Sequence, residues 1–186
     1  MKGWKFALAG VAALAALAAA AVTLAVWLGD RKLERTVVVR VVPVPFSSDA
    51  NAVKAGRDLY DERCARCHAP DGAGRKILDD EGLLVRAPNV TRNAPAIAAY
   101  SEADWVRAIR HGVDPHGRAL LFMPSEEFNR IGDADLAALV AYVRSLPPVD
   151  GEGATIRLPF RMKVMYGLGF MKDASEKIDH RRPSAP

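Results

Sequence analysis

Two cysteines and a histidine lie within five residues, at Cys64-Ala65-Arg66-Cys67-His68. Two thiols separated by two residues, with a histidine directly after the second, form the attachment signature of c-type haem. Each thiol adds to one haem vinyl group, so that two thioether bonds hold the porphyrin, and the histidine can then bring its imidazole onto the iron. The chain has only these two cysteines. The pattern therefore predicts one covalently attached haem c.

Two other uses of a cysteine pair fit the sequence less well. A thioredoxin-like redox pair lies at a strand-to-helix turn between βαβ elements, and no such alternation surrounds these cysteines. A structural zinc site needs four ligands in close pairs, and the sequence offers no second Cys or His pair. Haem attachment is the interpretation that the spacing favours.

The element that must position the motif is a helix directly before it, predicted over residues 50–63. Ser48 or Asp49 can cap its first turn. Gly56 has no side chain on the inner face of this helix, so another helix can approach closely there. Residues 71–99 show little regular pattern, and we expect an irregular chain that wraps a haem edge.

Two further helices are expected downstream. Ser101 to Asp104 resembles a capping box, and the helix it begins should end at His111-Gly112. Asp133 is predicted to cap the last helix, which Pro147-Pro148 ends. The loop between these helices contains Met123-Pro124. The predicted buried stripe of the last helix consists of Leu136, Leu139, Val140, Tyr142, Val143 and Leu146.

Met123 is the candidate for the second axial ligand of the iron. A thioether opposite His68 gives the His/Met ligation that raises the reduction potential of cytochromes c. The alternatives are that Met123 only fills the core, or that His111 or His116 binds instead. His111 is expected at a helix C-terminus, where the helix dipole favours the cation, and His116 in an exposed loop. Weaker candidates are the tail residues Met162, Met165 and Met171.

With these elements in place, residues 50–148 resemble class I cytochrome c domains. The resemblance rests on Gly56 and Tyr60 in the first helix, on Leu139 and Tyr142 in the last helix, and on Ala87-Pro88-Asn89-Val90. It implies an all-α fold, in which several short helices wrap one haem and the first and last helices cross at the glycine. It also implies that the carbonyl of Pro88 accepts the ring N–H of His68 and orients the imidazole.

The sequence is similar in more detail to membrane-anchored cytochromes that accompany periplasmic dehydrogenases. The shared segments are Tyr100-Ser101-Glu102-Ala103-Asp104-Trp105, Ile109 to Val113, Met123-Pro124-Ser125 and Ala141 to Pro148. Tyr100 and Trp105 are candidates to contact the haem propionates, although a tryptophan on a helix face often belongs simply to the core. Arg107, Arg110 or Arg118 could neutralise a propionate, and nothing in the sequence chooses among them.

Residues 6–28 contain no charged side chain over 23 positions. As a helix they would measure about 35 Å, which is enough for the ~30 Å hydrocarbon core of a bilayer. The competing interpretation is a cleaved signal peptide with small residues at Ala18 to Ala20. We favour an uncleaved anchor because the apolar run continues as far as Leu28.

The orientation of this segment involves two opposing signals. Two Lys or Arg residues precede the span and four follow it as far as Arg40, which mildly favours the orientation that leaves the following domain inside. Haem c maturation takes place on the outer side of the membrane and overrides this count. We therefore expect a single-pass protein of a bacterial inner membrane with its haem domain in the periplasm.

The sequence divides into four predicted parts. Residues 1–29 form the membrane anchor, 30–48 an extended linker and 49–150 the haem domain. Residues 151–186 form a basic and apolar arm with a disordered tail. The alternating residues 155–164 are expected either to lie extended on the domain or to dock to a membrane surface or a larger redox subunit.

Charge separates the domain from the arm. The haem domain carries 13 basic and 16 acidic side chains, whereas residues 157–182 carry 7 basic and 3 acidic ones. No long basic run with interleaved aromatic residues is present, so nucleic acid is not an expected partner.

The function that follows is one-electron transfer, because two filled axial positions leave no open iron site for a small-molecule substrate. We expect a monohaem cytochrome c of a bacterial respiratory chain, not an enzyme in itself, that passes electrons from a periplasmic dehydrogenase towards a terminal oxidase. The alternatives are a haem subunit of a dehydrogenase or oxidase complex, an open-site haem enzyme or gas sensor, and a structural subunit. The expected partners are membrane lipid and redox proteins.

Overall fold

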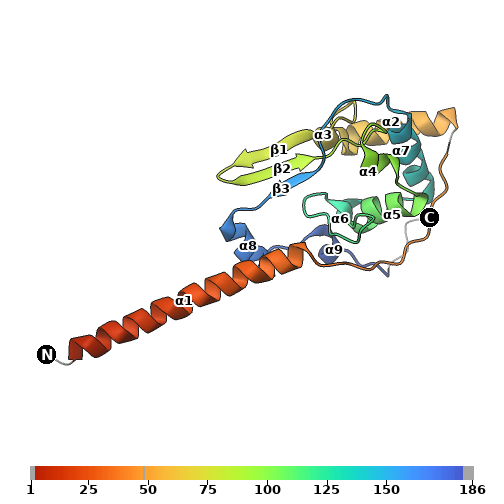
Figure 1. The fold of residues 1–186 in the computed structure, drawn as a ribbon. Coiled ribbons are helices and arrows are strands. Elements are labelled where there is room, and N and C mark those ends of the chain that lie inside the picture. Colours follow the sequence, from red (N-terminus) through yellow and green to blue (C-terminus); the bar gives the residue numbers. More distant parts are fainter. Residues whose placement is uncertain (1–2, 48, 182–186) are drawn as a thin grey trace. The chain divides into compact units, whose positions relative to one another are not determined.

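The computed structural model describes residues 3–47 and 49–181 (Figure 1). Ser48, one of the two predicted caps, lies outside the described residues, as do residues 1–2 and 182–186. The chain forms two compact units. The α1 unit consists of residues 1–35 and 159–171, and the haem-motif unit consists of residues 36–158 and 172–186. Each unit is described by itself.

The haem-motif unit is built on the crossing of α2 (Ala50–Arg63) and α7 (Asp133–Ser145). The start of α2 is as predicted, since the Asp49 carboxylate accepts a hydrogen bond from the Ala52 amide at 3.2 Å. A Cβ atom at Gly56 would overlap the backbone carbonyl of Ala138 on α7. The predicted close approach of another helix at Gly56 is therefore confirmed.

The N-cap of α7 is Gly132, so the prediction that Asp133 caps this helix is wrong. Asp133 is the first helical residue, and its carboxylate instead accepts a hydrogen bond from Arg110 at 2.7 Å. An acidic side chain in the first turn still interacts favourably with the helix dipole. The predicted stripe is buried at Leu136, Leu139, Val140, Val143 and Leu146, while Tyr142 is half-buried.

Helix α5 (Glu102–His111) has the predicted boundaries. Ser101 and Asp104 form a reciprocal capping box, and Gly112 ends the helix with a left-handed φ of 63°. Four single-turn helices complete the unit: α3 (Ala65–His68), α4 (Pro95–Ala98), α6 (Ser125–Phe128) and α9 (Ala174–Lys177). Side chains of α2, α5 and α7 meet in one hydrophobic cluster. The predicted helical fold around this core is confirmed.

A small antiparallel sheet was not predicted. Its strands are β1 (Arg75–Asp80), β2 (Leu83–Ala87) and β3 (Thr155–Arg157), in the order β1-β2-β3. The expectation of an irregular chain over 71–99 is thus wrong for the hairpin. Glu81 and Gly82, with φ of 43° and 84°, reverse the chain there. The strand pattern is weak in the sequence because every residue of β1 is exposed.

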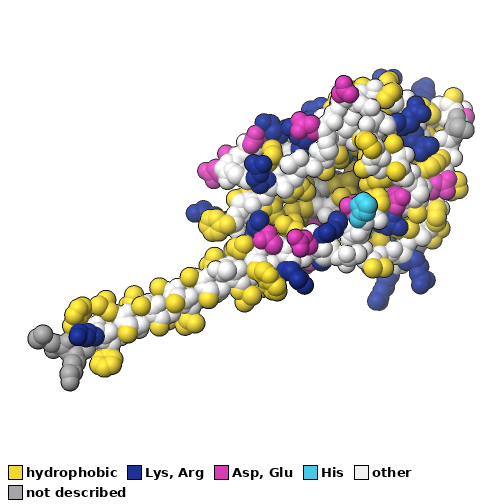
Figure 2. All heavy atoms as spheres, in the orientation of Figure 1, with side chains coloured by type: hydrophobic (Ala, Val, Ile, Leu, Met, Phe, Trp, Pro, Cys, Tyr) yellow, Lys and Arg dark blue, Asp and Glu magenta, His cyan; other side chains and the backbone are white. Residues whose placement is uncertain are grey.

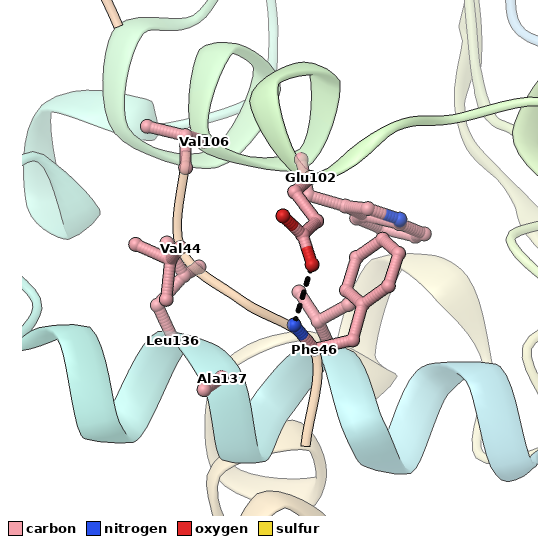
Figure 3. A pocket seen from close by; sticks show the side chains of 8 residues that line it. Val44, Phe46, Glu102, Val106, Leu136 and Ala137 are labelled. Atoms are coloured by element: carbon pink, nitrogen blue, oxygen red, sulfur yellow. Dashed lines mark hydrogen bonds between the residues drawn. The ribbon is translucent and has the colours of Figure 1, made fainter. Parts of the chain in front are cut away.

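The segment before α2 is extended and lies in a groove between α5 and α7 (Figure 3). Val44 is buried in the core, and the Phe46 amide donates a hydrogen bond to the Glu102 carboxylate at 3.0 Å. The guanidinium of Arg144 lies 4.1 Å from the centre of the Phe46 ring. These contacts make the segment part of the haem-motif unit, in the extended conformation that was predicted for it.

The α1 unit pairs α1 (Gly3–Leu33) with α8 (Phe160–Gly167). Helix α1 continues past the predicted anchor boundary at residue 29. Among the described residues it is the one helix that is long and apolar enough to cross a membrane, and hydrophobic side chains cover it in Figure 2. Of the two alternatives for residues 155–164, the extended arm fits β3 but not the chain from Phe160, which is helical. Good helix formers such as Arg161, Met162 and Lys163 follow Pro159 there. The docking alternative stays a prediction.

The tail that was expected to be disordered is folded at least as far as His180. Asp173 forms a capping box with Glu176 at the start of α9, and Ile178 is buried. A Cβ atom at Gly112 would lie 2.6 Å from the Cβ of Ala174, so the tail packs closely against the end of α5. Residues 182–186 of the predicted tail lie outside the described part of the chain.

Replacing Gly56 with alanine should destabilise the haem-motif unit. The new Cβ overlaps a backbone atom of α7 that cannot rotate away, and overpacking of this kind costs about 1–3 kcal/mol. The free energy of unfolding from urea titration of the full-length protein in mild detergent measures it. Gly153→Ala is the matched control, because nothing lies within 4 Å of that position; a change there should stay within about 0.5 kcal/mol. Equal effects of the two substitutions would contradict the helix crossing.

Candidate haem site

The two cysteines and the histidine lie on one turn of helix. Cys64 ends α2, and its carbonyl accepts hydrogen bonds from the amides of Cys67 at 3.0 Å and His68 at 2.9 Å. Residues three and four apart share one face of a helix. The backbone therefore presents both thiols and the imidazole on the same side, as attachment to one porphyrin requires.

The carbonyl oxygen of Pro88 lies 3.0 Å from Nδ1 of His68. When Nδ1–H donates this bond, Nε2 carries the lone pair and is available to a metal. Burial lowers the pKa of His68, which favours the neutral imidazole, while the bond to Pro88 acts in the opposite direction. A neutral ring with its second nitrogen hydrogen-bonded is the usual state of a histidine that binds a metal. The resemblance had implied this contact with Pro88, and the structure contains it.

Gly74 and Tyr60 hold the loop after the motif against the end of β2, next to Pro88. Gly74, with φ of 77°, donates its amide to the His68 carbonyl at 2.8 Å. A Cβ atom there would overlap the Ala87 carbonyl, so the loop after the motif lies directly against the end of β2. Tyr60 adds a hydrogen bond of 2.7 Å from its hydroxyl to the carbonyl of Ala69. The loop is thus fixed from both sides.

Asn89 and Thr91 form a buried network that the sequence interpretation missed. The side-chain oxygen of Asn89 accepts hydrogen bonds from the amide and the hydroxyl of Thr91 at 2.7 and 2.8 Å. Its side-chain nitrogen donates to the carbonyl of Val149 at 2.7 Å. The Pro88-Asn89 segment after β2 is thereby tied to the segment after α7. An asparagine directly after proline was the available signal, but only the fold shows its partners.

The environment of the Cys64 thiol disfavours redox chemistry there. Burial, with a smaller contribution from Cys67, raises the pKa of Cys64 to about 11. Catalytic redox cysteines need the opposite shift, because the thiolate is the reactive form. Among the described residues no cluster of three or more His, Cys, Asp or Glu side chains could hold a metal ion. Neither the redox-pair nor the zinc interpretation gains support.

Met123 lies in the loop between α5 and α6, half-buried against the hydrophobic cluster. Cys64 and Tyr100 contact the same cluster. The loop is held in place by Ser125, whose amide donates to the Met123 carbonyl at 2.8 Å and whose hydroxyl donates to the Ala108 carbonyl at 3.0 Å. The motif and Met123 therefore border one apolar region of the unit.

The alternative iron ligands are less suited. His111 is buried, and its Nδ1 lies 2.9 Å from Nδ1 of His180. The expectation of a cationic His111 is wrong, because burial, then His180, Arg110 and Arg107, lower its pKa to about 4. His116 is exposed in a turn, as predicted. The tail methionines Met162, Met165 and Met171 belong to the α1 unit.

Trp105 and Tyr100 pack edge to face, with ring centres 5.3 Å apart. Trp105 is 7% exposed, and its Nε1 is buried without a hydrogen-bond partner among the described residues. A buried donor left unpaired costs about 1–3 kcal/mol. Burial raises the pKa of Tyr100 to about 12, so its hydroxyl also remains a donor. A carboxylate brought by a ligand, such as a haem propionate, would satisfy the indole.

The three candidate arginines differ in how they are engaged. Arg107 forms an ion pair with Asp104 on α5, and Arg110 is buried between Asp133 and the Ile131 carbonyl. Arg118 is exposed. Figure 2 shows a recess in the haem-motif unit with hydrophobic side chains inside it. An apolar recess, an unpaired indole N–H, a thiol pair and an oriented imidazole together fit a covalently bound haem.

The stability of the haem-motif unit should fall as the pH decreases from about 6.5 to 4. His111 has a lowered pKa in the folded state, so the unfolded chain binds a proton in this range before the folded one does. The loss is at most about 1.4 kcal/mol per pH unit. His111→Gln should flatten the pH dependence of the free energy of unfolding in urea titrations of the full-length protein. Substitution of the exposed His116 should leave this pH dependence unchanged. An unchanged slope in His111→Gln would contradict a buried neutral His111.

The chain is similar to components of two bacterial dehydrogenases. It is 28% identical over 144 residues to the fructose dehydrogenase cytochrome subunit of Gluconobacter japonicus, covering 72% of this chain and 29% of that protein. It is 33% identical over 130 residues to one of the subunits of the nicotinate dehydrogenase of Pseudomonas putida KT2440, covering 64% of this chain and 11% of that protein. The chain therefore spans less than a third of either relative.

Residues 51–143 match the family described as cytochrome c oxidase, cbb3-type, subunit III. The match covers half of the chain and contains all of α2 except Ala50, the haem motif, Met123 and most of α7. This is the region in which the structure brings together the thiols, the oriented imidazole and the apolar cluster. The chain belongs to this family and carries a cytochrome c domain with covalently bound haem c.

Proposed function

We propose that this protein is a membrane-anchored, one-electron carrier whose iron is bound by His68 and Met123. The observation that carries the proposal is that the haem motif and Met123 border the same apolar cluster. Protein ligands on both faces leave no iron position for a substrate. The haem supplies a single Fe(II)/Fe(III) couple when bound, and the protein has no catalytic centre of its own.

The residues around the site support transfer without rearrangement. His68 is oriented by Pro88, and the loop of Met123 is tied to α5 through Ser125. Ligands held by the fold keep their positions in both oxidation states. The apolar side chains of the cluster would exclude water from a bound haem, and the indole N–H of Trp105 would be available to a propionate. Axial-ligand identity and burial are the means by which a protein tunes haem potential.

The electron donor is a periplasmic dehydrogenase in this proposal, and electrons then pass towards a terminal oxidase. Support comes from the relatives, both of which are named as subunits of dehydrogenases, one of them as the cytochrome subunit. These names also favour a second form of the proposal, in which the chain is a fixed haem subunit of such a complex. The acidic excess of residues 49–150 would steer encounters with a positively charged partner surface.

Helix α1 anchors the haem domain to the outer face of the inner membrane. Its side chains are exposed along almost its whole length, and its uncharged run matches the bilayer core. Haem c attachment requires the oxidising side of the membrane, so the haem domain lies in the periplasm. In this position the anchored haem domain exchanges electrons with its donor and its acceptor at the membrane surface.

Met123→His should lower the reduction potential of the haem. The identity of the axial ligands sets this potential over a range of about 0.8 V, so the change should be measurable. Met123→Ala should also remove the weak red charge-transfer band that thioether ligation gives to ferric haem. Redox titration and visible spectra of the full-length protein measure both. Met162→Ala is the matched control and should leave potential and spectrum unchanged. Wild-type values in both Met123 variants would exclude Met123 as the ligand.

The carrier role is tested in membranes of a strain that lacks the protein. Substrate-driven oxygen uptake through the partner dehydrogenase should be lost, while its activity with a soluble artificial acceptor remains. The wild-type gene should restore uptake and Met123→Ala should not. Full restoration by Met123→Ala would instead indicate a structural subunit. Loss of the artificial-acceptor activity in the deletion strain would favour the fixed-subunit form of the proposal.

A further inference from the structure

We infer that α8 is a second membrane-contacting element, which lies in the outer interface of the bilayer beside the end of α1. This inference rests on the proposed anchoring by α1 and adds a partner surface to it. The partner is the lipid surface itself. The residues that carry it belong entirely to the α1 unit.

Close backbone contact joins the two helices. A Cβ atom at Gly29 would overlap the carbonyl of Lys163, and one at Gly167 would overlap the carbonyl of Ala25. Paired small residues of this kind let helix backbones approach in membranes, where packing rather than the hydrophobic effect drives association. Helix α8 therefore crosses α1 at a defined position along its length.

Polar contacts fix the same crossing. Lys163 forms an ion pair of 2.8 Å with Asp30. The ammonium of Lys32 donates to the Tyr166 carbonyl at 3.2 Å and lies 4.2 Å from the centre of its ring. The Tyr166 hydroxyl accepts a hydrogen bond from Arg35 at 3.0 Å. These contacts pair the polar end of α1 with the buried side of α8.

The crossing lies at the depth of a membrane interface. The uncharged run of α1 ends at Leu28, and Asp30, Arg31 and Lys32 follow at once. The contacts to α8 come from Ala25, Gly29 and Lys32, on either side of this boundary. Trp27, half exposed in the same turn, is the residue type that concentrates at membrane–water interfaces.

The side of α8 away from α1 has the composition of an interfacial segment. Four apolar side chains are strongly exposed on α8 and the turn after it: Phe160 (61%), Met165 (48%), Leu168 (53%) and Phe170 (77%). The helix contains no acidic residue; Arg161 is exposed, whereas Lys163 is paired with Asp30 of α1. Basic residues beside aromatic and aliphatic ones favour insertion at an anionic lipid surface. These side chains belong to the same compact unit as the exposed apolar side chains of α1, which argues for lipid rather than a protein partner.

The test uses single new cysteines in the full-length holoprotein, because haem attachment consumes both native thiols. Leu168→Cys and Phe170→Cys are placed in nanodiscs of phosphatidylcholine and phosphatidylglycerol, with no other protein present. The readout is the rate of alkylation by a membrane-impermeant maleimide. Leu17→Cys reports on the centre of α1, and Gly153→Cys on the haem-motif unit. A thiol in an apolar environment forms little thiolate, so residues 168 and 170 should react at least about ten-fold more slowly than residue 153.

The outcomes separate this inference from the anchor. Rapid reaction at residues 168 and 170 with protection at residue 17 would overturn the α8 inference, leave the anchor standing and favour a protein partner for this surface. Rapid reaction at residue 17 as well would overturn the anchor and, with it, the inference. Slow reaction at all three positions supports both.

A matched glycine pair tests the role of the helix crossing. Gly29→Leu should displace α8, because the new side chain meets backbone, and should raise the reaction rate of a cysteine at residue 168 by about ten-fold. Gly10→Leu, where nothing lies within 4 Å, should leave this rate unchanged. An unchanged rate in the Gly29→Leu protein would overturn the assignment of α1 as the element that positions α8.

Discussion

The hydrogen bond between His68 and Pro88 is the contact on which the site depends. It spans 20 residues of sequence, and those residues form the loop after the motif and the β1–β2 hairpin. The hairpin is closed at one end by the Glu81-Gly82 turn and at the other by the approach of Gly74 to Ala87. Directly after Pro88, the side chain of Asn89 donates a hydrogen bond to the carbonyl of Val149, beyond α7. The orientation of the His68 imidazole therefore depends on the β1–β2 hairpin and on the segment after α7.

The two units obey different physical constraints. In the haem-motif unit, the α2–α7 crossing at Gly56 supports the hydrophobic cluster, and the indole N–H of Trp105 in this cluster has no hydrogen-bond partner among the described residues. In the α1 unit the apolar side chains of the uncharged run are exposed, and the proposed anchoring would place them in lipid instead of a core. Close glycine contacts join helices in both cases, at Gly56 in one unit and at Gly29 and Gly167 in the other.

Local signals in the sequence predicted the parts of the fold that local chemistry determines. The caps at Asp49 and Ser101, the stop at Gly112 and the crossing at Gly56 follow from side-chain type and helical spacing. The hairpin was missed because β1 is exposed along its whole length and lacks an alternating pattern. The neutral state of His111 depends on burial and on His180, which lies 69 residues away in the sequence. The alternation over 155–164 fitted a strand, but the contacts with α1 that stabilise α8 are non-local.

The central claim is that protein ligands occupy both axial positions of one haem c. Mixing the ferrous full-length protein with carbon monoxide tests it most directly, since the gas needs an open position on the iron. The account predicts a six-coordinate, low-spin spectrum that carbon monoxide does not change in the wild-type protein, and ready binding in Met123→Ala. A wild-type protein with high-spin ferric haem that binds carbon monoxide at once on reduction would contradict the account.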